Sequence, residues 1–74
     1  DKQQMREEFH AWCVREKSEA EEMLGRFESG MLKIGVYGPE GHKDGSDQMM
    51  KHLRHVITNM EHLATKVQAD IEAG

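Results

Sequence analysis

Three rows of apolar residues, each repeating every seven positions, run along residues 49–71 and constrain the fold more than any other feature. Row a contains Leu53, Met60 and Val67, row d contains Met49, Val56 and Leu63, and row e contains Met50, Ile57, Ala64 and Ile71. A two-stranded coiled coil needs only rows a and d, and a third row is typical of a helix that contacts two neighbours in a bundle. We therefore predict a helix over about residues 47–73 that packs on more than one other helix.

A second amphipathic segment runs from about Lys2 to Ile34. Its apolar positions recur every three or four residues, with Glu16 standing in the one gap: Met5, Phe9, Trp12, Ala20, Met23, Phe27, Met31 and Ile34. This spacing is close to the roughly 3.6 residues per turn of an α-helix. Because glycine weakens a helix interior, we expect the helix to cover about residues 2–30 and to end near Gly30 in the left-handed capping conformation.

The stretch "GVYGPEGHKDGS", residues 35–46, separates the two helices and holds four glycines and the only proline. This composition predicts a connector outside regular helix, in which "LKIGVYG" could hold a short extended piece. Its glycine spacing matches neither the P-loop nor the dinucleotide fingerprint. Asp44 or Ser46 is the expected N-cap of the second helix. The predicted fold is all-α, a single domain over residues 1–74, in which an antiparallel helical hairpin completes a three- or four-helix bundle with another helix or chain.

Length and charge exclude several classes of protein. A chain of 74 residues has a small core, and Cys13, the only cysteine, cannot close an internal disulfide. The net charge is −4 and no basic stripe is present, which argues against nucleic-acid binding. No apolar run approaches the ~20 residues of a membrane span. A lone free cysteine favours a reducing compartment, so we expect a cytoplasmic protein, and because the chain begins with Asp1 rather than Met we expect an excerpt or a processed product.

The histidines and the cysteine are the candidates for chemistry. A small metal-binding bundle could use Glu7, His10, His52 and His55, but Glu7-x-x-His10 is the only Glu-x-x-His motif, whereas di-iron bundles need two. The preferred interpretation places the histidines on a polar helix face. Cys13 lacks a neighbouring base and is expected to be a half-buried small hydrophobe. We therefore predict no enzyme activity, no metal and no cofactor.

The segment "EEFHAWCVREKSEAEEML" resembles the first helix of a spectrin-type repeat. The resemblance rests on Phe9 with Trp12 three residues later, the Glu16–Lys17 pair and Leu24. The segment "LRHVITNMEHLATKVQADIEA" is similar to the second helix of such a repeat. The resemblance implies that Trp12 anchors the interior of a three-helix bundle whose third helix comes from another chain. It also implies a scaffold or cytoskeletal linker without catalysis.

The predicted function is therefore a non-catalytic interaction module with an open apolar helical face. Its partner is a protein, either a foreign helix or a second copy that makes a dimeric four-helix bundle. The residues expected to form the core and the partner-binding face are Phe9, Trp12, Met23, Phe27, Met49, Met50, Leu53, Val56, Ile57, Met60, Leu63, Val67 and Ile71.

Overall fold

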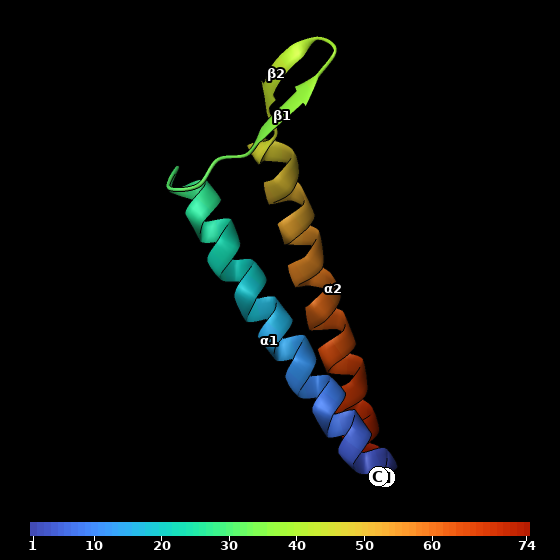
Figure 1. Ribbon diagram of the computed structural model, residues 1–74. Coiled ribbons are helices and arrows are strands. Elements are labelled where there is room, and N and C mark those ends of the chain that lie inside the picture. Colours follow the sequence, from blue (N-terminus) through green and yellow to red (C-terminus); the bar gives the residue numbers. More distant parts are fainter.

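Two long antiparallel helices lie side by side and make up most of the molecule. The computed structural model describes residues 1–74, with helix α1 at Lys2–Glu28 and helix α2 at Ser46–Ala73 (Figure 1). Both chain termini lie at one end of the pair, and residues 29–45 connect the helices at the other end. The molecule measures 54 × 26 × 16 Å, and since a helix with its side chains is about 10–12 Å across, this is a slab one helix thick. Neither helix combines the length and the apolar character needed to cross a lipid bilayer.

The connection between the helices contains a β-hairpin, which corrects the all-α fold class predicted from the sequence. Strand β1 at Gly35–Gly38 pairs antiparallel with strand β2 at Gly41–Asp44, in a register that places Tyr37 opposite His42. The architecture is therefore helix, two-stranded sheet, helix, and not a helical hairpin alone. The prediction was wrong because it took the glycines only as interruptions of helix, whereas here they lie at the ends of two short strands.

A tight turn at Pro39 and Glu40 closes this hairpin. The pyrrolidine ring presets the backbone angle that the first central position of such a turn requires. Gly41 follows with φ of 102°, a conformation that side chains disfavour. All eight strand residues are exposed, and the rings of Tyr37 and His42 lie 4.8 Å apart across the strands. The hairpin projects beyond the end of the helix pair (Figure 1).

Hydrogen bonds tie the base of the hairpin to the start of α2. The Ile34 N–H donates to Ser46 Oγ at 3.0 Å, and the Gly45 N–H donates to the Ile34 carbonyl oxygen at 2.8 Å. Ser46 is buried, and its own N–H donates to the Asp44 carboxylate at 2.9 Å. Hydrogen bonds from the Ser46 side chain, and secondarily from its backbone N–H, hold the pKa of Asp44 below its usual range. The N-cap position is Gly45, without a capping side chain, and not Asp44 or Ser46 as predicted.

Caps fix both ends of α1. The Asp1 carboxylate is the N-cap and accepts the Gln4 N–H at 2.8 Å. The helix ends at Glu28, and Gly30 adopts φ of 78° with its N–H donating to the Phe27 carbonyl oxygen at 3.1 Å. The left-handed glycine turns the chain away from the helix, as the sequence predicts for this position.

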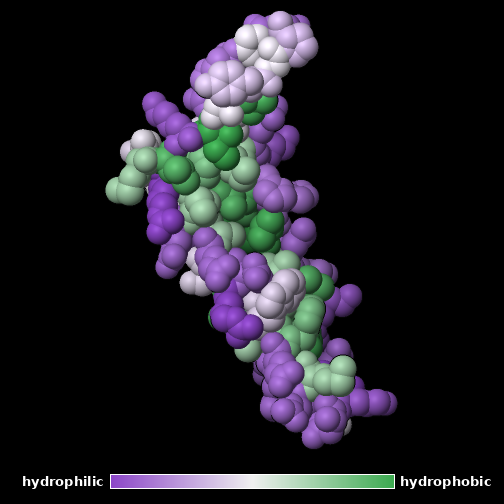
Figure 2. Space-filling view, viewed as in Figure 1, coloured by the Kyte–Doolittle hydropathy of each residue, from purple (hydrophilic) through white to green (hydrophobic).

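The hydrophobic core lies along the seam between α1 and α2. Its buried apolar residues are Cys13, Ala20, Phe27, Leu53 and Val67. Figure 2 shows hydrophobic side chains following the seam, most densely in the half of the molecule next to the hairpin. So few buried side chains give a small core, which is typical of a chain with marginal stability on its own.

Candidate functional site

A heptad row of α1 forms the centre of the seam, and two of its three residues, Ala20 and Phe27, belong to the predicted apolar stripe. Cys13, Ala20 and Phe27 are seven residues apart and all buried, and Cys13 has no exposed surface at all. Trp12, which the sequence predicts as an interior packing anchor, keeps 40% of its surface exposed beside the seam. The small side chains of Cys13 and Ala20 let the two helices approach along this row. Trp12 is adjacent to Cys13 in the helix and therefore points about 100° away from this row.

Row a of α2 meets this row of α1. Leu53 and Val67 are buried, and Met60 between them is partly buried. With about 3.6 residues per turn, rows d and e lie on the two sides of row a. The wide apolar face of α2 was predicted to contact two neighbouring helices. Its central row, row a, packs against α1, and one partly exposed row remains on each side of the seam.

One side of the seam is crossed by ion pairs, and we call it the bridged flank. Lys17 Nζ lies 3.3 Å from Glu61 Oε1, and Arg54 Nη2 lies 3.4 Å from Glu28 Oε2. Both pairs are partly exposed and contribute little to stability. Row e opens onto this flank, because Ala64 lines the same shallow pocket as Lys17 and Glu61.

The other side of the seam carries exposed apolar side chains and no ion pair between the helices, and we call it the open flank. Met5 and Phe9 precede Met23 and Phe27 by eighteen residues, which is about five helical turns, so all four share one side of α1. Met5 is 67% exposed, Phe9 is 41% exposed, and Trp12 is 40% exposed. The rings of Phe9 and Trp12 stack with centroids 5.7 Å apart and planes 30° apart. This pair forms an exposed aromatic surface near the chain ends.

An open apolar cleft of about 530 Å³ continues the open flank toward the hairpin. Six of its seven lining residues are hydrophobic, and the full set is Met23, Phe27, Leu32, Ile34, Met49, His52 and Leu53. Met49 belongs to row d, so Val56 and Leu63 of that row lie on the same flank. The open flank is therefore an apolar strip that runs from the cleft beside the hairpin to the aromatic pair near the termini.

Cys13 has no features of a reactive cysteine. Burial raises the pKa of the Cys13 thiol above its ordinary value, with only partial compensation from a backbone hydrogen bond. A nucleophilic cysteine needs the opposite shift, toward the thiolate. The half-buried position predicted for Cys13 is also corrected, since its side chain is completely enclosed by the helix pair.

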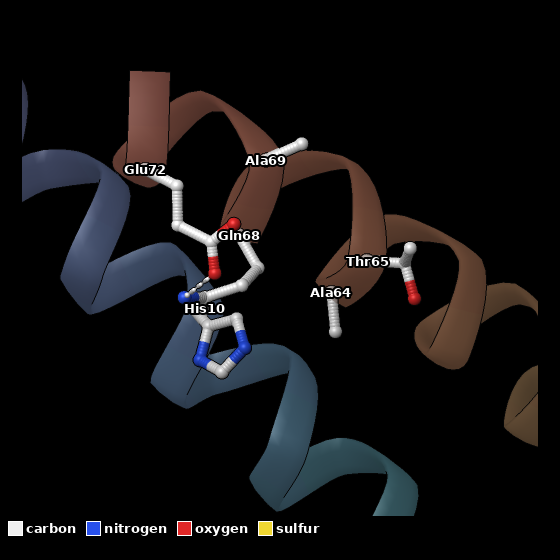
Figure 3. A pocket seen from close by; sticks show the side chains of 6 residues that line it. All are labelled: His10, Ala64, Thr65, Gln68, Ala69 and Glu72. Atoms are coloured by element: carbon white, nitrogen blue, oxygen red, sulfur yellow. Dashed lines mark hydrogen bonds between the residues drawn. The ribbon is translucent and has the colours of Figure 1, made fainter. Parts of the chain in front are cut away.

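The side chains of the alternative metal site are not brought together. His10 lies toward the chain ends, in a pocket of about 380 Å³ whose other lining residues come from α2 (Figure 3). His52 and His55 line a different pocket near the start of α2. No group of three or more histidine, cysteine, aspartate or glutamate side chains is placed to hold a metal ion.

The thirteen residues predicted for the core and the partner-binding face fall into three groups. Phe27, Leu53 and Val67 are buried, Phe9 and Trp12 are exposed, and the others are partly buried: Met23, Met49, Met50, Val56, Ile57, Met60, Leu63 and Ile71. The predicted set of thirteen did not include Cys13, Leu32 or Ile34. The heptad spacing of Cys13, Ala20 and Phe27 is the signal that could have identified the row that faces α2.

Comparisons with protein families, with curated proteins and with solved structures gave no match to this chain.

Proposed function

We propose that the chain is a non-catalytic protein-interaction module that binds helices along its open flank. The stacked and exposed Phe9 and Trp12, on the same side as the apolar cleft, carry this proposal. Contiguous exposed apolar surface marks interaction sites in folded proteins. Tryptophan in particular contributes strongly at the centres of interfaces, because it buries a large area with few torsions.

The one-layer shape supports the same proposal. Stable domains consist of at least two packed layers, because each helix must bury its apolar side. A slab 16 Å thick buries only the seam and leaves both sides of it to solvent. A helix lying along the open flank would cover row d of α2 and the aromatic pair of α1 together, as in helix-in-groove recognition.

The resemblance to a spectrin-type repeat agrees with this arrangement. In a repeat of that kind a third helix covers the first two, and here a helix from another chain would take its place. The same resemblance implies a scaffold or linker role, which is part of this proposal. Binding through a helical face needs no reacting group, so the proposed role involves no catalysis.

Dilution of the purified chain tests the proposal. A module that needs a second layer should lose helical circular dichroism and thermal stability as its concentration falls, because association and folding are linked. Trp12 is the only tryptophan. Its emission should shift to longer wavelength and its quenching by acrylamide should increase over the same dilution. A dilute monomer that stays fully helical, with a high melting temperature and with unchanged Trp12 quenching, contradicts the proposal.

A further inference from the structure

We infer that the peptide bond between Asp44 and Gly45 is a site of spontaneous aspartate isomerisation, which is protected from reaction as long as the hairpin is docked on α2. Asp44 is the only one of the four aspartates that is followed by glycine. The pair lies at the junction where β2 ends and α2 begins. The chemistry at this junction is independent of the proposed function.

Isomerisation of an aspartate needs only the chain itself and water. The Gly45 nitrogen attacks Cγ of Asp44, a C–N bond forms, and the amide proton and the hydroxyl of the carboxylic acid leave as water, which closes a succinimide ring. Water then opens the ring. Attack on the former side-chain carbonyl restores aspartate, whereas attack on the backbone carbonyl gives isoaspartate, in which the chain runs through the former side chain. The product has the same mass as the starting chain.

The packing of the junction favours both residues of this reactive pair. A Cβ atom at position 45 would lie 2.7 Å from Val36 Cγ2, so a side chain there is overpacked. The Asp44 carboxylate accepts the Ser46 N–H at 2.9 Å at the start of α2. Glycine has no side chain to shield its nitrogen, so it permits ring closure more readily than any other following residue. The docked hairpin thus favours a dipeptide that isomerises readily once it is free.

The same docked arrangement opposes ring closure. The Gly45 N–H donates to the Ile34 carbonyl oxygen at 2.8 Å, and the nitrogen loses this bond when it attacks. Asp44 pairs with Gly35 in the ladder, and the succinimide ring requires a ψ angle far from that of a strand residue. Hydrogen bonds from Ser46, first from its side chain, hold the pKa of Asp44 below its usual range. The carboxyl therefore stays ionised, and a carboxylate is attacked more slowly than the acid.

Opening of the junction removes this protection. Asp44 is exposed and Gly45 is partly exposed, so water has access for opening the ring. All eight strand residues of the hairpin are exposed, and segments without buried side chains open locally at lower cost than a core. The rate in the native chain should therefore equal the rate in the free chain multiplied by the fraction of time for which the junction is open.

Isomerisation would prevent the hairpin from docking in its present register. The extra backbone carbon falls between the ladder pair of Gly35 with Asp44 and the adjacent hydrogen bond between Ile34 and Gly45. These two contacts cannot both keep their geometry when the chain between them is longer. The reaction therefore converts a brief opening of the junction into lasting undocking of the hairpin.

Comparison of the native and the unfolded chain tests the site and its protection. Digestion after Glu40 and Glu61 releases one peptide that contains Asp44, and also Asp47, whose neighbour Gln48 makes it the internal control. Isoaspartate shifts the retention of this peptide at unchanged mass, and electron-transfer fragmentation locates it.

The incubation is at neutral pH, at a protein concentration at which circular dichroism shows a fully helical chain, and in parallel in concentrated urea. Isoaspartate at Asp44 should form at least about tenfold more slowly in the native chain than in urea, because only the open fraction reacts. Equal rates overturn the protection. Absence of isoaspartate at Asp44 in urea, or equal amounts at Asp47, overturns the site.

Paired serine substitutions test whether the docked junction is the protecting element. Ser46→Ala removes the oxygen that accepts the Ile34 N–H. Ser29→Ala removes a hydroxyl at the other end of the connection, where it bonds to the backbone of Arg26 and Met31. Ser46→Ala should accelerate isomerisation toward the rate in urea while helical circular dichroism is retained, and Ser29→Ala should keep the wild-type rate. Equal rates in the two variants contradict the junction as the protecting element.

Asp44→Asn keeps the test decisive if Ser46→Ala unfolds the helices. The amide oxygen can still accept the Ser46 N–H, and ring closure now releases ammonia, so that ring opening leaves an acid of higher mass than the amide. Asn59, which precedes Met60 in α2, is the internal control. The mass increase at position 44 should appear much faster in urea than in the native variant, and far faster than at Asn59. Equal rates at position 44 in the native and unfolded variant overturn the inference.

Discussion

Two adjacent residues, Trp12 and Cys13, have opposite environments because consecutive positions on a helix point about 100° apart. Cys13 points into the seam and is completely buried, while Trp12 points to the open flank. The stability of the isolated chain therefore depends on the smaller side chain. The larger one keeps much of its ring exposed on the open flank and adds less to the seam.

Burial of Cys13 predicts slow modification of its thiol. The pKa of Cys13 is raised by desolvation, so at a given pH a smaller fraction is thiolate than for a free cysteine, and reactivity should increase only at higher pH or on unfolding. Ser18 is exposed on α1 and provides the control. Ser18→Cys, treated with an aromatic disulfide reagent under native conditions, should show one fast thiol and one slow thiol. A single fast phase for both would show that the seam opens readily.

At the level of the elements, the junction between the hairpin and α2 leaves no space for a side chain at Gly45. A Cβ atom there would lie 2.7 Å from Val36 Cγ2, whereas a Cβ atom on Gly38 would meet nothing within 4 Å. Gly45→Ala should lower the free energy of unfolding by about 1–3 kcal/mol through overpacking. Gly38→Ala should leave it unchanged or raise it by up to about 1 kcal/mol, because alanine restricts the unfolded chain.

Thermal or urea unfolding monitored by circular dichroism measures both changes. Equal stability of the two variants would mean that the hairpin moves away from α2 at little cost, and that its hydrogen bonds to Ser46 do not fix its position.

The sequence predicted the long elements better than their contacts. The heptad rows on residues 49–71 predicted α2, because no regular secondary structure other than a helix places three apolar rows at this spacing. A short extended piece was expected in "LKIGVYG", where β1 lies, but its pairing with β2 was missed because both strands are short and fully exposed, so no alternation of apolar and polar residues marks them. Only the turn in "GPEG" carried a usable signal.

The seam on α1 was predicted only in part, since the apolar stripe contained Ala20 and Phe27 but not Cys13. The apolar residues of α1 are spread over a wide part of the helix surface. The predicted stripe was centred on the large side chains of Phe9 and Trp12. A two-helix contact is instead centred on a row with small residues, Cys13 and Ala20. The sequence contained both rows, but hydrophobicity alone does not show which of them faces the partner helix within the chain.

At the scale of the whole molecule, the small core makes each buried side chain important. Leu53 belongs to the cluster with Ala20 and Phe27. Leu53→Ala should lower the free energy of unfolding by about 2–5 kcal/mol, which is comparable to the total of roughly 3–5 kcal/mol that such a core supplies. We therefore expect the variant to be largely unfolded at a concentration at which the wild-type chain is folded.

Met31 provides the matched control because it is apolar and 80% exposed. Met31→Ala should change the free energy of unfolding by no more than about 0.5 kcal/mol. If Leu53→Ala is as stable as Met31→Ala, the seam is not the source of stability in this chain.

The position of the chain termini gives the molecule two distinct poles (Figure 1). Anything joined to residue 1 or to residue 74 emerges at the pole opposite the hairpin, about one molecular length of 54 Å away. A fused domain, an affinity tag or attachment to a surface would therefore leave the Tyr37–His42 tip presented outward. The fold can act as a short stalk, tethered at one pole and displaying a small strand pair at the other.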